Sequence, residues 1–226
     1  YLAELDAAID ADRVAAGKKS LKREDDQTPP ATKEIKVSTV DPDAGFMARD
    51  NKPTGFFYLD HRTVDGVHAL IVDTHVTPGN VHDSLAVDEL YYKVTEKQPQ
   101  VEVIVADSAY KTPHICKKVF GDGRVLSTAY KRPQTMKNGH EWWKYVYDEF
   151  YDCVICPEYQ PLKYSTTNRD GYREYKSDPN ICAACPTRER CTHSRGCIKT
   201  VQRHIWKDYE ELADDARYTP AYAQLY

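Results

Sequence analysis

The sequence predicts a mixed α/β domain with a small cysteine-rich module, and three observations carry this prediction. An Asp-Gly pair separates two strand-like runs, which is typical of a β-hairpin. A short apolar run at residues 101–106 lies between two segments of helical periodicity, as a buried strand of an α/β sheet does. Six of the seven cysteines fall between Cys153 and Cys197, which indicates a region stabilised in a different way.

The N-terminal third of the chain contains a helix, a linker and the hairpin. Residues 1–16 have apolar side chains on one helical face, so a short amphipathic helix is expected there. Residues 18–36 are polar, charged and broken by prolines, which is typical of a linker. A turn-rich stretch at 41–45 leads to the hairpin. Its strands are expected at Gly55–Thr63 and Val67–Thr77, with positive φ angles at the Asp-Gly pair.

Helices and strands then alternate. A helix is expected after Asp83-Ser84 to about residue 95, a strand buried on both faces at 101–106, a helix at 113–120 and a further strand at 124–130. Asp107 directly follows the buried strand. Ligands and catalytic groups gather beyond the carboxyl ends of strands in such sheets, so Asp107 is a candidate catalytic residue. The alternative is a solvated residue or a cap at the start of a loop.

Composition limits the classes of protein that these 226 residues can form. With 41% hydrophobic and 29% charged residues, the chain has the composition of an ordinary globular protein rather than a disordered or coiled-coil one. Its longest apolar stretches are too short to cross a bilayer. No basic segment followed by an apolar one suggests a secretory signal.

The formal net charge is −4, yet basic residues cluster in one segment. Between Arg188 and Lys207 six basic residues stand against a single acid, Glu189. Such a run is either a solvated face or a surface that binds the phosphates of a nucleic acid. The candidate phosphate-binding residues are Arg188, Arg190, Arg195, Lys199 and Arg203.

The spacing of the cysteines indicates a metal site rather than disulfides. The pairs Cys153-x2-Cys156 and Cys182-x2-Cys185 each let two thiolates face one tetrahedral ion, which favours structural zinc. Incidental reduced thiols and a redox dithiol are the alternatives. Spacing alone favours the two pairs as ligands, and Cys191 is a further candidate.

Several segments together resemble one family, the DDE-type transposases of bacterial insertion sequences. The segments are Thr77-Pro78-Gly79-Asn80-Val81-His82-Asp83-Ser84, Ile104-Val105-Ala106-Asp107-Ser108-Ala109-Tyr110, the entry Ser38-Thr39-Val40-Asp41-Pro42-Asp43-Ala44 and the cysteine segment from Cys182 to Thr192. The last two resemble a branch with a cysteine-rich insert. The resemblance spans roughly residues 35–226.

The resemblance implies a ribonuclease H-like fold and a catalytic triad of two aspartates and a glutamate that holds two Mg²⁺ ions. Asp107 matches the second acid. Double-stranded DNA at transposon ends is the implied partner, with self-association on DNA, no membrane, and a place in the bacterial cytoplasm near the nucleoid. The implied organisation is a helix and linker (1–37), a partial catalytic core (38–136), a zinc-ribbon-like insert (137–207) and the start of a C-terminal helical part (208–226).

The sequence departs from the family pattern at the other two acids. The expected Asp-Gly-Thr strand is not found before the hairpin, so Asp41 and Asp43 are the fallback candidates for the first acid. Asp83 matches a family position but is expected to cap the helix that follows it. The third acid belongs to a Tyr-x2-Arg-x3-Glu signature, of which only Tyr226 is present. The chain is therefore expected to be a fragment that is inactive alone.

The resemblance also favours a different set of zinc ligands from the one that spacing favours. In the resembling branch the leading cysteine precedes a proline, as Cys156 does, and a later cysteine closes the motif, as Cys191 does. The implied ligands are Cys156, Cys182, Cys185 and Cys191, with Cys153 free and His193 as a substitute ligand. The alternatives to a transposase are a non-catalytic, zinc-stabilised nucleic-acid-binding module and a remnant of a decayed element.

Overall fold

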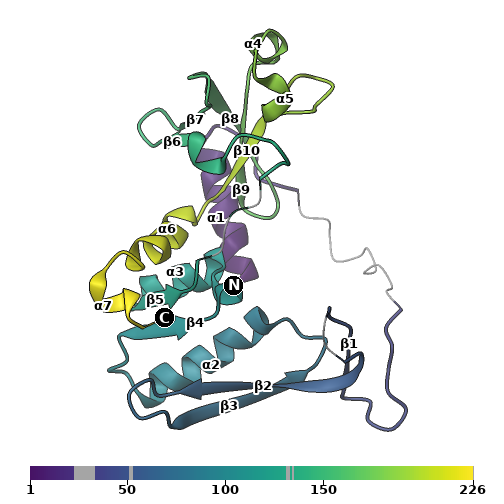
Figure 1. Cartoon of the computed structure of the whole chain (residues 1–226), viewed down its shortest axis with the longest axis vertical. Coiled ribbons are helices and arrows are strands. Elements are labelled where there is room, and N and C mark those ends of the chain that lie inside the picture. The colour runs from purple at the N-terminus through teal and green to yellow at the C-terminus, as the bar shows by residue number, and fades with distance from the viewer. Residues whose placement is uncertain (23–33, 51–52, 131–132, 134, 226) are drawn as a thin grey trace. The chain divides into compact units, whose positions relative to one another are not determined.

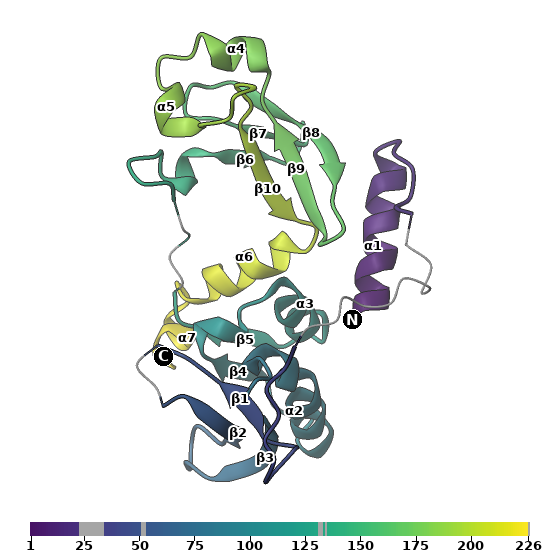
Figure 2. The same cartoon turned by 90° about the vertical axis from the view of Figure 1, so that its right-hand side faces the viewer.

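A computed structural model gives the fold of the chain (Figure 1). The structure describes residues 1–22, 34–50, 53–130, 133 and 135–225. The chain divides into two compact units, and Figure 2 shows the elements of each from a second side. Unit 1 comprises residues 1–23 and 131–208, and unit 2 comprises residues 24–130 and 209–226. Both units combine helices with sheets, so the predicted mixed α/β class is confirmed.

Unit 2 contains an antiparallel sheet of three strands, in the order β1-β2-β3, and a parallel pair, β4-β5. Its elements in chain order are β1 (Gly45–Met47), β2 (Gly55–Val64), β3 (Ile71–Pro78), α2 (Asp83–Lys97), β4 (Val103–Ala106), the 3-10 helix η1 (Ser108–Tyr110), α3 (Pro113–Gly121), β5 (Val125–Thr128), most of α6 (Lys207–Ala216) and α7 (Pro220–Ala223). Every element predicted between residues 55 and 130 is present. Strand β1 was not predicted.

The β2–β3 hairpin has a longer connection than the Asp-Gly pair predicts. Strand β3 begins only at Ile71. In the connection before it, the backbone C=O of Asp65 accepts a bond from Ala69 N, and the backbone N–H of Asp65 donates one to Leu70 O, both 2.8 Å. The positive φ angle lies at Ala69 (55°) and not at Gly66. The Asp65 carboxylate accepts from Val67 N at 3.0 Å and approaches His68 Nδ1 at 2.7 Å. These side-chain contacts stabilise a wider loop, so the tight-turn prediction is wrong.

Helices α2 and α3 of unit 2 begin where polar side chains satisfy free N–H groups of the first turn. Thr112 accepts a bond from Ile115 N at the start of α3, and Pro113 occupies the first turn, as predicted. His82 caps α2 by accepting a bond from Ser84 N at 3.2 Å. Asp83 is therefore the first residue of α2 rather than its cap, which corrects the expected role of this carboxylate.

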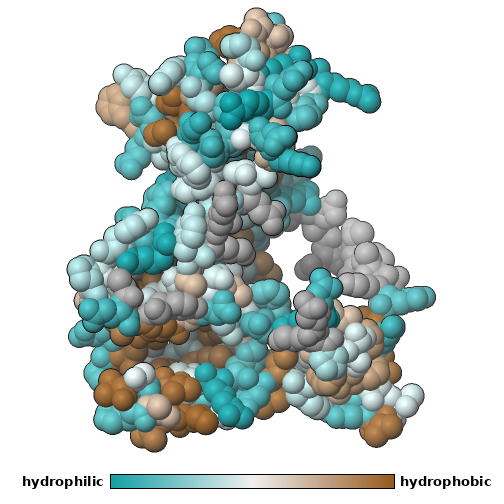
Figure 3. All heavy atoms as spheres, viewed as in Figure 1, coloured by the Kyte–Doolittle hydropathy of each residue, from teal (hydrophilic) through white to brown (hydrophobic). Residues whose placement is uncertain are grey.

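The core of unit 2 lies between α2, α3, α6 and the parallel pair. Its buried members are Tyr91, Ile115, Cys116, Val119, Leu126 and Ala213. Strand β5 is largely buried, whereas Val105 of β4 is 47% exposed. The apolar run at 101–106 is thus covered on one face only, and the prediction of burial on both faces is wrong. In the space-filling view apolar side chains (brown) reach the surface over unit 2 (Figure 3).

Two glycines let the entry segment and the end of the hairpin approach closely. A Cβ atom on Gly45 would lie 2.3 Å from Asn80 Oδ1 and 2.5 Å from Gly79 N. A Cβ atom on Gly79 would lie 2.8 Å from Phe57 O, which accepts a hydrogen bond from Gly79 N. The segments at residues 38–44 and 77–84, which carry part of the family resemblance, therefore lie in close backbone contact. Strand β1 continues this contact by pairing with β2.

Unit 1 is built on an antiparallel sheet of five strands in the order β10-β9-β8-β7-β6. Its elements are α1 (Leu2–Ala15), the 3-10 helix η2 (Trp142–Lys144), β6 (Val146–Asp148), β7 (Cys153–Ile155), β8 (Pro161–Thr167), β9 (Tyr172–Lys176), α4 (Pro179–Ala183), α5 (Arg188–Cys191) and β10 (Thr200–His204). Val154, Leu162 and Tyr175 form its buried centre. The structure thus gives the cysteine-rich segment a sheet of its own together with α1.

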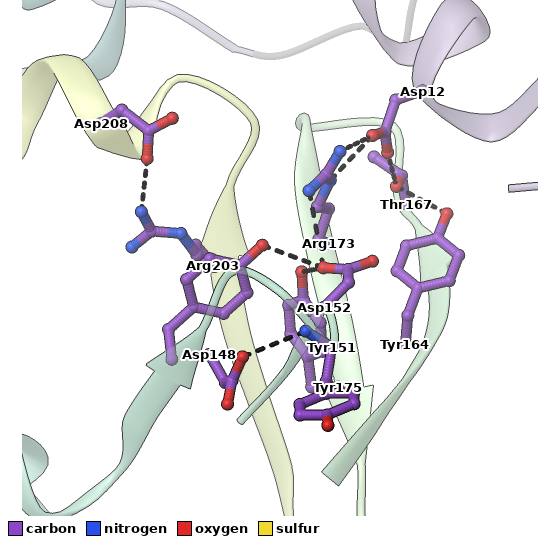
Figure 4. A network of polar contacts seen from close by, with 11 residues as sticks. Asp12, Asp148, Tyr151, Asp152, Tyr164, Thr167, Arg173, Tyr175, Arg203 and Asp208 are labelled. Carbon is purple, nitrogen blue, oxygen red and sulfur yellow. Dashed lines mark hydrogen bonds and ion pairs between the residues drawn. The ribbon is translucent and has the colours of Figure 1, made fainter. Parts of the chain in front are cut away.

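Helix α1 is fastened to this sheet by polar contacts (Figure 4). Arg173 Nε on β9 donates to Asp12 Oδ1 at 2.7 Å, and Thr167 also bonds to Asp12. Arg13 Nη1 donates to Thr167 O at 2.7 Å. Asp12 is only 9% exposed as a side chain, so its charge depends on these partners. The N-terminal helix therefore belongs to unit 1, although part of the linker that follows it lies outside the described residues.

We expect Gly45→Ala to lower the free energy of unfolding by about 1–3 kcal/mol, because the new methyl group would collide with backbone atoms of Gly79 and Asn80. Urea denaturation measures this change. Gly66→Ala is the matched control, since no atom lies within 4 Å of its Cβ position, and it should change the value by less than about 0.5 kcal/mol. Equal effects of the two substitutions would contradict the close approach at Gly45.

Candidate functional site

Asp107 lies at the carboxyl end of β4, where the sequence predicts it. The residue is exposed and caps η1, with its Oδ1 accepting bonds from Ala109 N at 3.2 Å and Ser108 Oγ at 3.1 Å. Among the described residues Oδ2 has no hydrogen-bond partner. One carboxylate oxygen is thus held by the turn while the other faces solvent, an arrangement that suits a ligand of a hard divalent cation.

Asp83 and Asp41, the weaker candidates for a catalytic role, occupy different places in unit 2. Asp83 lies near Tyr110, whose phenol pKa is raised by burial and by the charges of Asp83 and Asp107. Asp41 accepts hydrogen bonds from Tyr58 Oη on both carboxylate oxygens, each at 3.0 Å. This partner on β2 holds Asp41 just before β1.

The cysteine-rich segment encloses a cavity of about 30 Å³ in unit 1. Four cysteines line it: Cys156, Cys182, Cys185 and Cys191. They come from the turn after β7, from α4 and its end, and from the last residue of α5. Cys153 lies on β7, is buried and does not line the cavity, and Cys116 belongs to the core of unit 2. The structure therefore gathers the four cysteines that the resemblance implies.

Three of the four sulfur atoms have hydrogen-bond partners. Gln160 N donates to Cys156 Sγ at 3.4 Å, Cys191 Sγ lies 3.2 Å from Tyr145 Oη, and Cys185 Sγ lies 3.6 Å from Thr187 Oγ1. Burial raises the pKa of the Cys191 thiol, whereas the Tyr145 hydroxyl and the charge of Lys199 lower it. Burial and the bond to Cys191 raise the pKa of Tyr145, which therefore stays protonated.

His140 is a buried histidine in the wall of the same cavity. It is 8% exposed, and neither ring nitrogen has a hydrogen-bond partner among the described residues. Burial, together with the charges of Arg190 and Lys144, lowers the pKa of His140. His193, which the sequence suggests as a substitute ligand, is exposed and lines an open hollow that Cys191 and Lys199 also line.

No group of three or more histidine, cysteine, aspartate or glutamate side chains, within the described ranges, is arranged so that it could hold a metal ion. Asp107 thus stands without a second and third acid at metal-binding distance among these residues. The four cysteines share a cavity without converging on one point. Their donor chemistry fits zinc, because thiolates with hydrogen-bond donors around them are its usual structural ligands. Their side chains would have to turn inward to bind it.

The five basic candidates differ in what their side chains contact. Lys199 Nζ donates to Cys191 O at 3.1 Å and lies over the Tyr145 ring. Arg203 pairs with Asp208, stacks over the Tyr147 ring and has a side chain that is 13% exposed. These two residues stabilise unit 1. Arg190 and Arg195 are exposed and Arg188 is half-buried.

Residues 155–226 match the family model of a transposase DDE domain. The match begins in β7 and includes Cys156, the cavity cysteines, β10 and the C-terminal helices, which is about a third of the chain. It confirms the resemblance to DDE-type transposases that the motifs indicate, although Asp107 lies outside the matched residues. No curated protein and no solved structure matches the chain. No helix in the described part of the chain is long and apolar enough to span a membrane.

Sequence reasoning missed His140 and the donors around the sulfurs. His140 precedes the first cavity cysteine by 16 positions, and Tyr145, Gln160 and Thr187 belong to no spacing motif. The sequence feature that marks His140 is the Gly139-His140 pair at the start of the aromatic segment that leads into the cysteine region.

Proposed function

We propose that the chain is part of a DNA transposase that breaks and joins strands at transposon ends by divalent-metal-dependent phosphoryl transfer. The proposal rests on the match of residues 155–226 to a transposase DDE domain, and the exposed Asp107 at the carboxyl end of β4 supports it. Double-stranded DNA is the proposed substrate. Self-association on DNA and a bacterial cytoplasmic location near the nucleoid belong to the same proposal.

In the proposed mechanism Asp107 is one of three acids that hold the catalytic cation through an oxygen atom. When bound, Mg²⁺ activates the attacking oxygen and stabilises the leaving one. The contacts of Asp107 Oδ1 with Ala109 N and Ser108 Oγ fix the carboxylate, and Oδ2 is the oxygen that would hold the cation. Asp41, held by Tyr58, is the candidate in this chain for the first acid.

The cysteine-lined cavity is proposed to bind structural zinc through Cys156, Cys182, Cys185 and Cys191. These four cysteines line one cavity, and three of their sulfur atoms have hydrogen-bond partners. Both observations favour this ligand set over the one that includes Cys153, which lies on β7 and does not line the cavity. The role of this zinc would be to join α4, α5 and the turn after β7, which no long apolar interface connects. A small segment of this kind gains much of its stability from the metal.

A second candidate function is a non-catalytic module that binds nucleic acid through unit 1, including one left by a decayed element. The exposed side chains of Arg190 and Arg195, close to the proposed zinc site, favour it. This function needs neither Asp107 nor a second acid, so the Asp107 experiment distinguishes it from the transposase.

In a transposase that carries this chain and a complete set of acids, we expect Asp107→Asn to abolish strand cleavage in Mg²⁺. The amide still accepts the bond from Ala109 N but has lost the negative charge that holds the cation. DNA binding and melting temperature should stay unchanged. Asp60→Asn, at an exposed ion pair with Arg62, is the control and should cleave normally. Cleavage by Asp107→Asn at a rate near that of the parent would refute the assignment.

We expect one zinc ion per chain by elemental analysis, lost on Cys191→Ser and kept on Cys153→Ala. Cys191 lines the cavity whereas Cys153 is buried in β7, so only the first substitution removes a ligand. Chelation should loosen residues 150–200 in hydrogen exchange and leave unit 2 protected. The reverse pattern for the two cysteines would favour the set built on Cys153.

Because Arg190 and Arg195 are exposed, we expect the affinity of the chain for DNA to fall as the salt concentration rises. Each phosphate that a basic residue neutralises contributes about 0.9 to the slope of log affinity against log salt. Joint replacement of Arg190 and Arg195 by alanine should therefore reduce this slope by about 2, measured by gel shift across a salt series. Arg203→Ala should leave the slope unchanged, because Arg203 already pairs with Asp208. A slope that does not respond to the double substitution would make this segment an ordinary solvated face.

A further inference from the structure

The cavity of unit 1 has one sulfur without a donor and one histidine without a partner. Cys156, Cys185 and Cys191 each have an N–H or O–H group within hydrogen-bond distance, whereas the structure gives Cys182 Sγ none among the described residues. His140 lines the same wall with both ring nitrogens buried and unpaired in the part of the chain that is described. A buried polar group without a partner costs about 1–3 kcal/mol, so this arrangement needs a reason.

The position of His140 is fixed by its backbone. Gly139 N donates to Met136 O at 2.8 Å in a turn where Asn138 has a φ angle of 60°. His140 N then donates to Arg190 O at 3.0 Å, the residue before Cys191. A Cβ atom on Gly139 would lie only 3.3 Å from Arg190 O, so this glycine permits the close approach. The backbone of His140 is thereby held against α5, which carries Cys191.

We propose that His140 donates a ring N–H to the thiolate of Cys182 when the cavity holds a metal ion, and so completes the set of donors around the four sulfurs. Four thiolates around Zn²⁺ carry a net charge of −2, and hydrogen bonds to sulfur spread this charge inside a poorly solvated site. His140 is then a positioning residue and not a ligand. The inference rests on the proposed zinc site and adds a residue outside every cysteine motif.

Two exposed surfaces elsewhere in the chain do not indicate a binding partner. The exposed face of the β2–β3 hairpin has no occupant that the structure indicates. Phe150 and Tyr151 are exposed at the β6–β7 turn, but Asp148, Glu149 and Asp152 surround them with negative charge, which opposes contact with nucleic acid.

The test compares two substitutions of similar size in the whole 226-residue chain. His140→Gln keeps an N–H donor, and His140→Leu removes it while filling the space. Zinc affinity is measured by competition with a chelator, and Co²⁺ absorption reports the ligand atoms. We expect His140→Leu to weaken zinc binding by about 10–100-fold, with His140→Gln restoring most of the loss and the cobalt spectrum of four thiolates unchanged in both. Alkylation mapped by mass spectrometry should become faster at Cys182 in His140→Leu.

His68→Ala is the control, because His68 is exposed in the β2–β3 loop of unit 2, and this variant should bind zinc like the parent chain. Parent-like affinity and Cys182 reactivity in His140→Leu would overturn the inference while leaving the zinc site intact. A cobalt spectrum of three sulfurs and one nitrogen in the parent, lost on substitution, would overturn it by making His140 a ligand. A parent chain that binds no metal would remove the zinc site itself together with this inference. Circular dichroism confirms that each variant is folded.

Discussion

The ion pair between Arg173 and Asp12 is the interaction on which unit 1 depends. It joins α1 to β9, and Arg173 also lies 3.7 Å from Asp152, which sits in the turn between β6 and β7. Asp152 in turn accepts hydrogen bonds from Tyr147 and Tyr175, so one arginine connects the helix, the centre of the sheet and the strand that leads to Cys156. A buried charge of this kind is stable only while all its partners are present.

This constraint explains how a segment with a small apolar core supports a cysteine-lined cavity. Three buried residues form the centre of the sheet, and much of the remaining interior consists of tyrosines with hydrogen-bonded hydroxyl groups. The sheet is therefore positioned by directional bonds rather than by apolar volume. The cavity lies beyond the strands, where α4 and α5 contribute only short helices, so the metal would supply the connection that packing does not.

The sequence predicted local structure well and long-range contacts poorly. Apolar periodicity, Pro113 in the first turn of α3, and the position of Asp107 are local signals, and the structure contains the helices and the strand end that they predict. The prediction of a tight turn at the Asp-Gly pair is wrong because the bonds of Asp65 to Val67 and His68 stabilise a wider loop. The attachment of α1 to β9 had no sequence signal, because it depends on side chains far apart in the chain. The place of His140 in the cavity wall was marked only by the Gly139-His140 pair.

The separation between Asp12 and Arg173 has a consequence for synthesis. The two residues are 161 positions apart, and ribosomes add about 5–20 residues per second, so Asp12 waits roughly 10–30 s for its partner. During that time residues 131–208, which complete the unit that buries Leu5 and Ile9, are still being made. A helix of 14 residues is marginally stable alone. Helix α1 therefore gains the protection from proteases that unit 1 gives it only when strand β9, made much later, has left the ribosome.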